Sequence, residues 1–285
     1  MLVGYLGPKG SFTHGVASHA FLNDELIPYE SLTELLKAFE QEAVGAAVVP
    51  VENSIEGSVH ETIDYLFHHG DIQAVAEIVY PIQQQLLVAK KDRPIHEIYS
   101  HPQALAQGKA FIDRHYPTAK LEMTASTAYA ARYVSLHPEK NIAAIAPLSA
   151  AHEYQLYVQH KDIQEMAANY TRFWILGKKA VEMPTSLHHT EDKVSLALTL
   201  PSNQPGALYK ALSTFSWRNI NMTKIESRPL KTALGEYFFI IDLLMEKEEW
   251  IRFAFEELSA MEIAVKVFGE YPVYTVNEKE IDSNE

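Results

Sequence analysis

A carboxylate and an amide stand side by side directly after a short apolar run. Glu52 and Asn53 follow Ala46–Val49, whose apolar residues are typical of a buried strand. Open α/β sheets bind ligands at the carboxyl ends of such strands, so this pair could bind a small polar molecule or move a proton. A second interpretation stays open. Ser58 and Glu61 have the spacing of a capping box, and the segment could be only a turn before a helix.

Three glycines near the N-terminus, Gly4, Gly7 and Gly10, stand between an apolar run and a helical pattern. Their spacing is not the dinucleotide motif GxGxxG, and Gly10 is followed by Ser11, which excludes a Walker motif. What remains is a tight turn in which Ser11 or Thr13 caps the helix. The turn is either a plain N-cap or a place where free N–H groups bind a carboxylate, and the residues leave both interpretations open.

Two further polar segments stand at predicted strand-to-helix junctions. Ser100 precedes a helix that we expect from Pro102 to about His115, and Gln107 lies on that helix. Ser126 and Thr127 have the N-cap residue types and precede the helical pattern AYAARYV. These junctions supply hydroxyl and amide donors from several strand ends.

Thr171 and Arg172 precede Phe173 and the rest of the apolar run FWIL. Taken by itself, this pattern indicates the start of a strand with an arginine at the surface. Any chemistry at these residues would depend on what the fold brings next to them.

The residues do not favour metal-dependent or hydrolytic chemistry. The sequence has no Cys, which excludes Cys-ligated zinc, a disulfide framework and a thiol nucleophile. His96, Glu97 and His101 form HExxxH, one residue longer than the zinc motif HExxH, so we interpret the histidines as surface residues. The sequence has no G-x-S-x-G segment and no recognisable Ser/His/Asp set, so nucleophilic hydrolysis lacks support.

Two turns in the C-terminal part are candidates for binding a free amino acid. Pro205–Tyr209 leads from a strand into a helix, and Glu226–Pro229 ends the next strand. A free amino acid needs N–H groups that face its carboxylate and an apolar pocket for its side chain. Turns near one end of a ferredoxin-like sheet could supply both.

The pattern of elements predicts two kinds of domain. Up to about residue 176, short apolar runs alternate with helical patterns, which indicates an α/β layer architecture with mainly parallel sheets. After residue 192 the pattern becomes βαββαβ, the ferredoxin-like order. All 13 histidines lie at or before His189, and the polar segment Glu182–Asp192 lacks periodicity. We interpret that segment as a linker.

Net charge and hydropathy exclude several classes of protein. The 285 residues include 24 Lys and Arg against 37 Asp and Glu, a net charge of −13, which disfavours nucleic-acid binding and a polybasic membrane surface. The N-terminal sequence MLVGYLGPKGSF lacks the basic region of a signal peptide. No apolar run approaches the roughly 18 residues of a membrane span. We expect a soluble, cytoplasmic protein.

In their order along the chain, these segments resemble prephenate dehydratase over about residues 2–272. The motifs are GYLGPKGSFT, VVPVENSIEGSV, YSHPQALAQ, STAYAA, IAAIAP and NYTRFWILG, followed by PGALY and IESRP of the family's ACT domain. The resemblance is to the monofunctional form, because no helical chorismate mutase segment precedes the first strand.

The resemblance implies an α/β protein with a two-lobed, periplasmic-binding-protein-like catalytic domain and a ferredoxin-like ACT regulatory domain. The implied boundaries are a catalytic domain over 1–181 with an inserted second lobe over about 79–163, a linker over 182–192, an ACT domain over 193–272 and an acidic tail over 273–285. ACT domains typically pair, so we expect a homodimer or homotetramer.

The implied reaction is the decarboxylating dehydration of prephenate to phenylpyruvate, a carbon–oxygen lyase step of phenylalanine biosynthesis. It needs no metal and no organic cofactor. The implied partners are prephenate as substrate and phenylalanine as a feedback inhibitor bound to the ACT domain.

The family's motifs also imply roles for individual residues. The implied catalytic residues are Thr171, Arg172, Phe173, Glu52, Asn53, Ser100 and Gln107. The implied substrate-binding residues are Ser11, Phe12, Thr13, Ser126 and Thr127. The implied effector-binding residues are Gly206, Ala207, Leu208, Glu226, Ser227, Arg228 and Pro229. Tyr209 departs from the family, which often has a small aliphatic residue there, and this could alter effector preference.

Within this set, Thr171 would donate a hydrogen bond to the leaving oxygen. A Thr hydroxyl is a poor acid, so we expect polarisation with relayed protonation rather than simple acid transfer. Arg172 would supply positive charge and Phe173 a dry wall. Glu52 could orient the site or relay a proton, and the sequence leaves that open.

Two alternatives remain at this point. Arogenate dehydratase acts on a substrate that differs only in carrying an amino group in place of the keto group. A non-catalytic amino-acid sensor with an ACT domain would have the same fold, since fold does not determine function.

Overall fold

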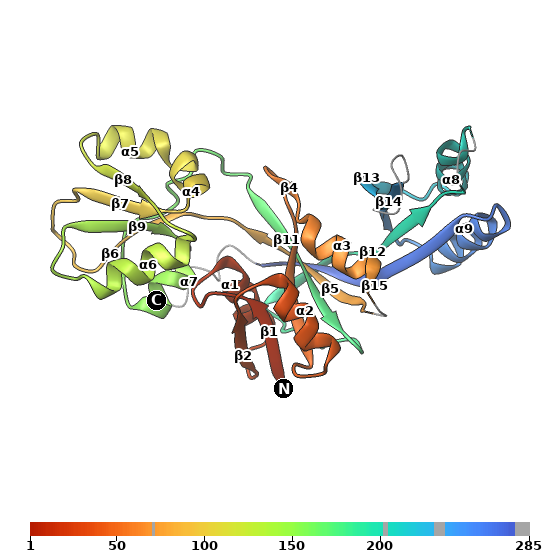
Figure 1. Cartoon of the computed structure of the whole chain (residues 1–285), viewed down its shortest axis with the longest axis horizontal. Helices are drawn as coiled ribbons and strands as arrows, with labels where there is room; N and C mark the ends of the chain where they lie inside the picture. The colour runs from red at the N-terminus through yellow and green to blue at the C-terminus, as the bar shows by residue number, and fades with distance from the viewer. Residues whose placement is uncertain (70–71, 202–204, 231–236, 277–285) are drawn as a thin grey trace.

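The computed structural model describes residues 1–69, 72–201, 205–230 and 237–276. Figure 1 shows three bodies along the long axis, with the first lobe in the middle, the second lobe at the left and a C-terminal unit at the right. No helix within the described part of the chain is long and apolar enough to cross a membrane.

The first lobe is built on the sheet order β2-β1-β3-β11-β5. Strands β1 to β3 are mutually parallel, and β11 runs antiparallel to both β3 and β5. Serine side chains cap α1 and α2, which cover the sheet with their apolar faces. Its elements are β1 (Leu2–Leu6), α1 (Phe12–Ala20), β2 (Glu25–Tyr29), α2 (Leu32–Glu40), β3 (Ala46–Asn53), β4 (Gly57–Ser58), α3 (His60–His68), β5 (Ala74–Pro81) and β11 (Tyr170–Gly177).

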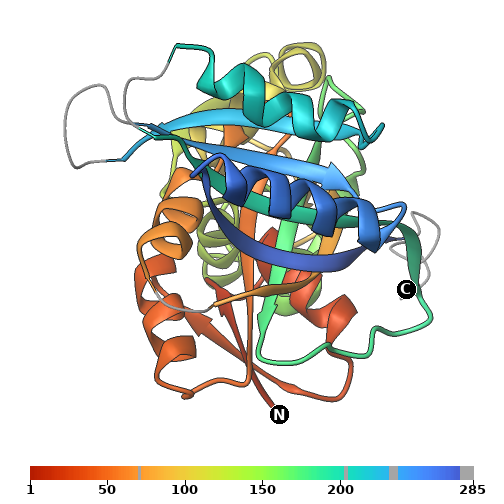
Figure 2. The same cartoon turned by 90° about the vertical axis from the view of Figure 1, so that its right-hand side faces the viewer.

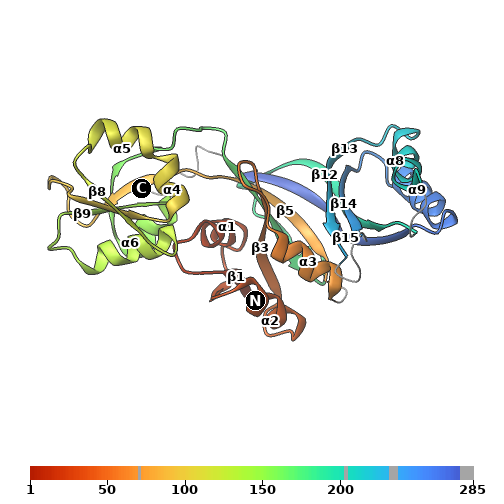
Figure 3. The same cartoon turned by 45° about the horizontal axis from the view of Figure 1, so that its top comes forward.

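The second lobe is inserted between β5 and β11, which lie next to each other and carry the chain out of the first lobe and back (Figure 3). Its sheet order is β10-β6-β9-β7-β8. Its elements are β6 (Gln85–Val88), β7 (Glu97–Ser100), α4 (Pro102–Gln107), α5 (Lys109–His115), β8 (Lys120–Met123), α6 (Thr127–Leu136), β9 (Ile142–Ala146), α7 (Leu148–Tyr154) and β10 (Tyr157–His160). The single helix expected from Pro102 to about His115 was wrong. It is two helices, α4 and α5, that meet at Gly108.

The C-terminal unit has the βαββαβ order that the sequence predicts. Its elements are β12 (Leu187–Thr199), α8 (Ala207–Ser216), β13 (Met222–Pro229), β14 (Tyr237–Leu244), α9 (Glu248–Ala260) and β15 (Ala264–Val276). The strand order is β13-β14-β12-β15, and α8 and α9 lie together over the strands (Figure 2). The predicted fold class, a two-lobed α/β domain followed by a ferredoxin-like unit, is therefore confirmed.

The linker expected over residues 182–192 is partly strand. β12 begins at Leu187, and its first residues pair with the end of β15. The end of β15 also pairs with β5, where Val273 lies opposite Glu77, so the two domains share one ten-stranded sheet. The polar residues of 188–192 sit in a largely solvent-facing ribbon, which is why they resemble a linker in the sequence. Residues 273–276, expected in the tail, belong to β15, and the rest of that tail lies outside the described residues.

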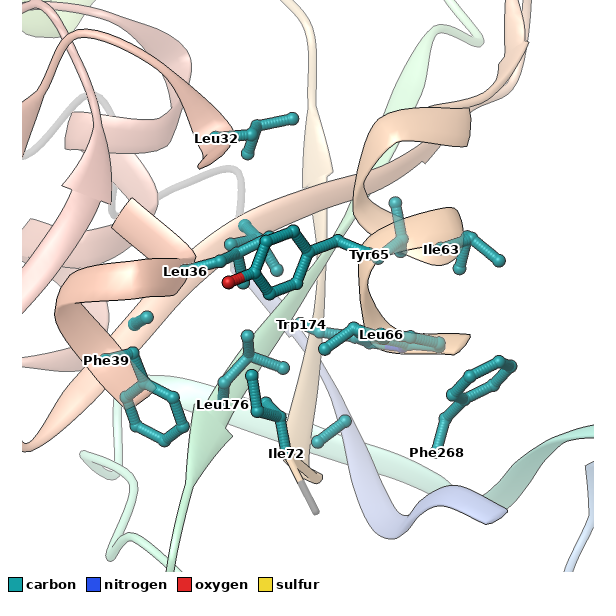
Figure 4. Packing of buried hydrophobic residues seen from close by; sticks show 14 of the residues in the cluster. Leu32, Leu36, Phe39, Ile63, Tyr65, Leu66, Ile72, Trp174, Leu176 and Phe268 are labelled. Atoms are coloured by element: carbon teal, nitrogen blue, oxygen red, sulfur yellow. The ribbon is translucent and has the colours of Figure 1, made fainter. Parts of the chain in front are cut away.

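One hydrophobic core connects the first lobe to the C-terminal unit (Figure 4). Trp174 and Leu66 from the first lobe are in the same buried cluster as Phe268 of β15. Phe67 of α3 stacks on Phe238 of β14 with ring centroids 3.8 Å apart. The C-terminal unit is therefore packed onto the back of the strands that form the site.

Candidate active site

A cleft of about 350 Å³ lies between the two lobes. Its lining comes from α1, β3 and the following turn, from the two connecting strands, and from the helix starts of the second lobe. The lining residues are Phe12, Thr13, Pro50, Asn53, Glu56, Ile82, Gln84, His101, Gln103, Ala104, Gln107, Ala125, Ser126, Thr127, Thr171 and Phe173. Eight residues predicted from the sequence are thereby brought together: Phe12, Thr13, Asn53, Gln107, Ser126, Thr127, Thr171 and Phe173.

Two helices from opposite lobes point their N-terminal ends at this cleft. The Ser11 hydroxyl caps α1 by accepting a hydrogen bond from the His14 N–H, and the Ser126 hydroxyl caps α6 by accepting from the Tyr129 N–H. Thr13 and Thr127, in the first turns of these helices, line the cleft. First-turn N–H groups have no partner within their own helix and carry partial positive charge. The cleft therefore suits a ligand with two negatively charged groups.

Asn53 and Thr171 lie opposite each other on the paired strands β3 and β11. The Asn53 Nδ2 donates to Thr171 Oγ1 and to Asn169 Oδ1, both at 2.9 Å. The Asn53 Oδ1 accepts from the N–H groups of Ile55 and Glu56 at 3.0 and 3.1 Å. These two N–H groups fix the orientation of the amide, so its NH₂ group must face Thr171.

This arrangement decides what the Thr171 hydroxyl can do. Its oxygen accepts a hydrogen bond from Asn53, which leaves the hydroxyl hydrogen to be donated into the cleft. The side chain is largely buried, with 8% of the residue exposed. Accepting one bond polarises the O–H group and strengthens its next bond as a donor. Thr171 is therefore placed to donate to an oxygen atom of a bound ligand.

Glu52 and Asn53 are consecutive residues of β3, so their side chains point to opposite faces of the sheet. Asn53 shares the cleft face with Thr171, and Glu52 shares the opposite face with Arg172. A β-bulge follows in the pairing, because Arg172 lies opposite Glu52 but Phe173 lies opposite Pro50, so Val51 is the extra residue and Pro50 returns to the cleft face. Sequence reasoning placed Glu52 and Asn53 in one site because it ended the strand at Val49, whereas β3 continues to Asn53.

Four predicted site residues lie outside the cleft lining within the described part of the chain: Glu52, Arg172, Ser100 and Ser11. Ser100 is fully buried and donates to the Ile145 carbonyl at 2.6 Å, which joins β7 to β9. Ser11 acts as the N-cap of α1, one of its two predicted interpretations. The capping box expected at Ser58 and Glu61 was wrong, because α3 begins after Val59 without a side-chain cap.

Arg172 is at the centre of a buried group of charges that faces the C-terminal unit. Its guanidinium contacts Glu52 and Glu77 at 2.6 Å and Asp242 of β14 at 2.7 Å. Lys224 of β13 contacts the other oxygen of Glu52 at 2.8 Å. Lys193 contacts Glu77 at 3.3 Å. We call Glu52, Glu77, Arg172, Lys193, Lys224 and Asp242 the interface charge cluster.

Two carboxyl groups of this cluster, those of Glu77 and Glu52, have pKa values below their usual range. Burial works to raise the pKa of Glu77, but the charge and hydrogen bonds of Arg172 and the charge of Lys193 hold it below its usual range. Burial acts the same way on Glu52, and hydrogen bonds from Lys224 and Arg172 hold the pKa of Glu52 low. A carboxylate with a depressed pKa is a poor proton donor at neutral pH. The Glu52 carboxylate contacts Arg172 and Lys224 and is absent from the cleft lining among the described residues.

Gln84 is a cleft residue that sequence reasoning missed. It is 3% exposed, and its Nε2 faces the Gln107 Oε1 at 3.4 Å. The Gln84 Oε1 and the Gln107 Nε2 are buried without a hydrogen-bond partner among the described residues. Buried amides without partners are uncommon in folded proteins, so these two atoms are candidates for binding a ligand. The signal in the sequence was the run of three glutamines, Gln83 to Gln85, at the start of the apolar strand β6.

The predicted effector residues fall in two places on the C-terminal unit. Gly206 is the N-cap of α8 with a φ of +76°, a conformation that favours glycine, and Ala207 and Leu208 open the helix. Glu226 and Arg228 face the first lobe, where Glu226 contacts Ser58 and is 2.8 Å from His60, and Arg228 is 2.9 Å from Asp64 of α3. Ser227 and Pro229 point the other way and are exposed.

Within the described residues, no group of three or more His, Cys, Asp or Glu side chains is arranged to hold a metal ion. The cleft lining combines hydroxyl and amide groups and apolar walls with the two titratable residues Glu56 and His101.

Comparisons with known proteins place this geometry in a family. The family described as prephenate dehydratase matches residues 3–181. A prephenate dehydratase of Lactococcus lactis subsp. lactis (strain IL1403) is 49% identical over 280 residues, 98% of this chain and 100% of the relative. One from Bacillus subtilis (strain 168) is 43% identical, covering 96% and 99%. The solved structure of a prephenate dehydratase from Arthrobacter aurescens in complex with L-Phe is similar with a TM-score of 0.80 and 30% identity, covering 95% and 90%.

Proposed function

The chain belongs to the prephenate dehydratase family, and on this premise we propose that its interlobe cleft converts prephenate to phenylpyruvate, CO₂ and water. The observation that carries the proposal is the Asn53–Thr171 pair, which presents a polarised hydroxyl between two helix N-termini. Prephenate has two carboxylates and a ring hydroxyl. The cleft offers a complementary group for each.

In the proposed binding mode, the N-termini of α1 and α6 hold the two carboxylates from opposite sides. The ring then lies against Phe173 and Ile82, and the C4 hydroxyl faces Thr171. Holding the substrate from both lobes fixes the angle between the ring and Thr171, which is the kind of positioning that lowers a barrier.

The reaction breaks two bonds. The ring carboxylate leaves as CO₂, the electron pair of that C–C bond moves into the ring, and the C4–O bond breaks as the ring becomes aromatic. The leaving oxygen takes up one proton and departs as water. Thr171 stabilises the charge that develops on this oxygen by donating a hydrogen bond, and the proton reaches it by relay from solvent.

Asn53 acts through Thr171. It holds the hydroxyl so that its hydrogen is directed into the cleft, and its own carbonyl is held by two backbone N–H groups. Phe12 and Phe173 exclude water from the breaking C–C bond. A less solvated carboxylate loses CO₂ more readily.

We also propose that the C-terminal unit is an ACT regulatory domain through which phenylalanine inhibits the enzyme, and that the protein is a homodimer or homotetramer. The complex of the Arthrobacter aurescens relative with L-Phe supports phenylalanine as the ligand. The N-terminus of α8 has no side-chain cap at Gly206, so its N–H groups could bind the carboxylate of phenylalanine. Tyr209 is 74% exposed, so a bulky side chain fits at this position.

The test is to incubate the protein with prephenate and, in parallel, with arogenate, and to measure phenylpyruvate and phenylalanine formation with and without added phenylalanine. We expect turnover of prephenate and its inhibition by phenylalanine. If the protein converts arogenate and not prephenate, arogenate is the substrate and the proposed substrate is wrong. If a folded protein that binds phenylalanine converts neither compound, the result favours the non-catalytic amino-acid sensor. Undiminished turnover with phenylalanine would refute the regulatory part only.

A further inference from the structure

Strands β3 and β11 carry two sets of side chains at neighbouring positions. On one face, Asn53 and Thr171 line the cleft. On the other face, the adjacent residue of each strand, Glu52 or Arg172, contacts the C-terminal unit. Strand alternation creates this division, and the antiparallel pairing of Asn53 with Thr171 and of Glu52 with Arg172 puts both members of each pair on the same face. The two sets are linked through a single peptide unit in each strand.

The contacts across the domain boundary are short and buried. Arg172 contacts Asp242 of β14 at 2.7 Å, and the Asp242 side chain is 2% exposed. Glu52 contacts Lys224 of β13 at 2.8 Å, and the Lys224 side chain is 12% exposed. Glu77, which is fully buried, holds Arg172 from the first-lobe side and also accepts from Trp174. Separating such pairs leaves charges buried without partners, which is strongly unfavourable. The strands must therefore follow the position of the C-terminal unit.

The contacting residues of β13 share one face of the strand. Lys224, Glu226 and Arg228 alternate with exposed residues and contact Glu52, His60 and Asp64 respectively. Of these three contacts, the Lys224–Glu52 pair alone reaches a strand that lines the cleft. The Arg228–Asp64 pair ends on α3, and Asp64 is absent from the lining of the cleft among the described residues. This difference supplies a matched control at the same interface.

We propose that Arg172 and Glu52 are positioning residues that set the Asn53–Thr171 pair according to where β13 and β14 lie. The inference rests on the proposed function and adds its means of regulation. A ligand that shifts the C-terminal unit would move Asp242 and Lys224, the shift would pass to Arg172 and Glu52, and the Thr171 hydroxyl would turn from the substrate. Such coupling requires that the ligand prefer one position of the unit over the other.

The experiment compares Asp242→Asn and Lys224→Met with Asp64→Asn as the control and Lys224→Arg as the conservative variant. Two quantities are measured with and without phenylalanine: kcat and KM for prephenate, and the NMR signal of the Thr171 methyl group, assigned by its loss in Thr171→Ser. Urea unfolding verifies that each variant is folded.

We expect Asp242→Asn and Lys224→Met to lower kcat by about tenfold or more while KM changes by less than about threefold, the pattern of misplaced catalytic groups. The Thr171 methyl signal should shift in both variants. The response of kcat to phenylalanine should be reduced. Asp64→Asn and Lys224→Arg should behave as the unaltered protein.

Unchanged kcat and an unchanged Thr171 signal in folded Asp242→Asn and Lys224→Met would overturn the inference, even if the unaltered protein converts prephenate. An equal effect of Asp64→Asn would also overturn it, because the effect would then belong to the interface as a whole. If the unaltered protein has no activity, the proposed function fails, and the Thr171 signal alone still decides whether the strands transmit the change.

Discussion

The two faces of the β3–β11 strand pair differ in how their polar groups are satisfied. On the cleft face, Asn53 and Thr171 are neutral, and the hydroxyl hydrogen is left for a ligand. On the opposite face, Arg172 is surrounded by three carboxylates that it neutralises together with two lysines. The charged groups of this strand pair therefore hold the two domains together, whereas Asn53 and Thr171, which we propose to act on the substrate, are uncharged.

The first prediction concerns the charged face and has the largest expected effect. Arg172→Met should lower the free energy of unfolding by about 3–5 kcal/mol, because it leaves Glu77 and Asp242 buried without their main partner. Urea unfolding measures this. Arg252→Met is the control, since Arg252 is exposed and its pair with Glu256 is 4.0 Å long, so its effect should stay within about 0.5 kcal/mol. If both changes lower the free energy of unfolding equally, the buried ion pairs of Arg172 do not contribute more than an exposed pair, and the prediction is wrong.

The second prediction concerns the cleft face. Thr171→Ala should lower kcat by about 10²-fold or more with a modest change in KM, because it removes a donor to the leaving oxygen. Thr171→Ser should retain most of the activity. Thr62→Ala is the control, since Thr62 is a buried hydroxyl that donates to the Pro50 carbonyl and is absent from the cleft lining among the described residues. Near-normal turnover of Thr171→Ala would remove this hydroxyl from the mechanism.

The third prediction concerns the pH dependence of stability, which should come from the charged face and not from the cleft face. In the folded protein the pKa values of Glu77 and Glu52 lie below the ordinary 4.5, because the neighbouring positive charges and hydrogen bonds lower them more than burial raises them. Their stabilisation is therefore complete above about pH 4.5 and is lost as the pH falls through the depressed values. Unfolding free energy measured from pH 7 to 3.5 should fall in this acid range. Glu77→Gln should flatten this fall, whereas Asn53→Ala on the cleft face should leave its slope unchanged.

The fourth prediction has the smallest effect. Gln84→Leu should raise KM for prephenate by about tenfold, because the free amide atoms at this corner of the cleft bind the substrate in both ground and transition states. kcat should change by less than about threefold. Gln83→Leu, one residue earlier and outside the cleft lining among the described residues, is the control. An unchanged KM in Gln84→Leu would indicate that the Gln84 and Gln107 amides contact each other but do not bind the substrate.

Local patterns in the sequence were sufficient to predict most of the helices and strands. The short apolar runs Leu2–Leu6, Ile142–Ala146 and Tyr237–Leu244 are strands, and the βαββαβ order was legible in the sequence. Such features depend on hydrophobic period and capping residues, which are properties of short segments. The strand β5 was missed. Its buried Glu77 interrupts the apolar pattern, and that glutamate is tolerated only because Arg172 and Lys193 come to it from distant parts of the chain.

The sequence by itself determined the family, the fold class and eight of the residues that line the cleft. These residues could be predicted because their motifs follow strands, and the carboxyl ends of parallel strands meet at one edge of the sheet. The tertiary structure alone decided which face each of those residues occupies. Glu52 and Asn53 alternate between the two faces of β3, and the pairing of β3 with β11 decides that Asn53 joins Thr171 at the cleft while Glu52 joins Arg172 on the other face. The strand pairing that joins the two domains, in which Val273 lies opposite Glu77, and the charges that Arg172 meets there likewise depend on residues far apart in the sequence. Neighbours at such separation leave no local pattern, because only the folded chain brings them together.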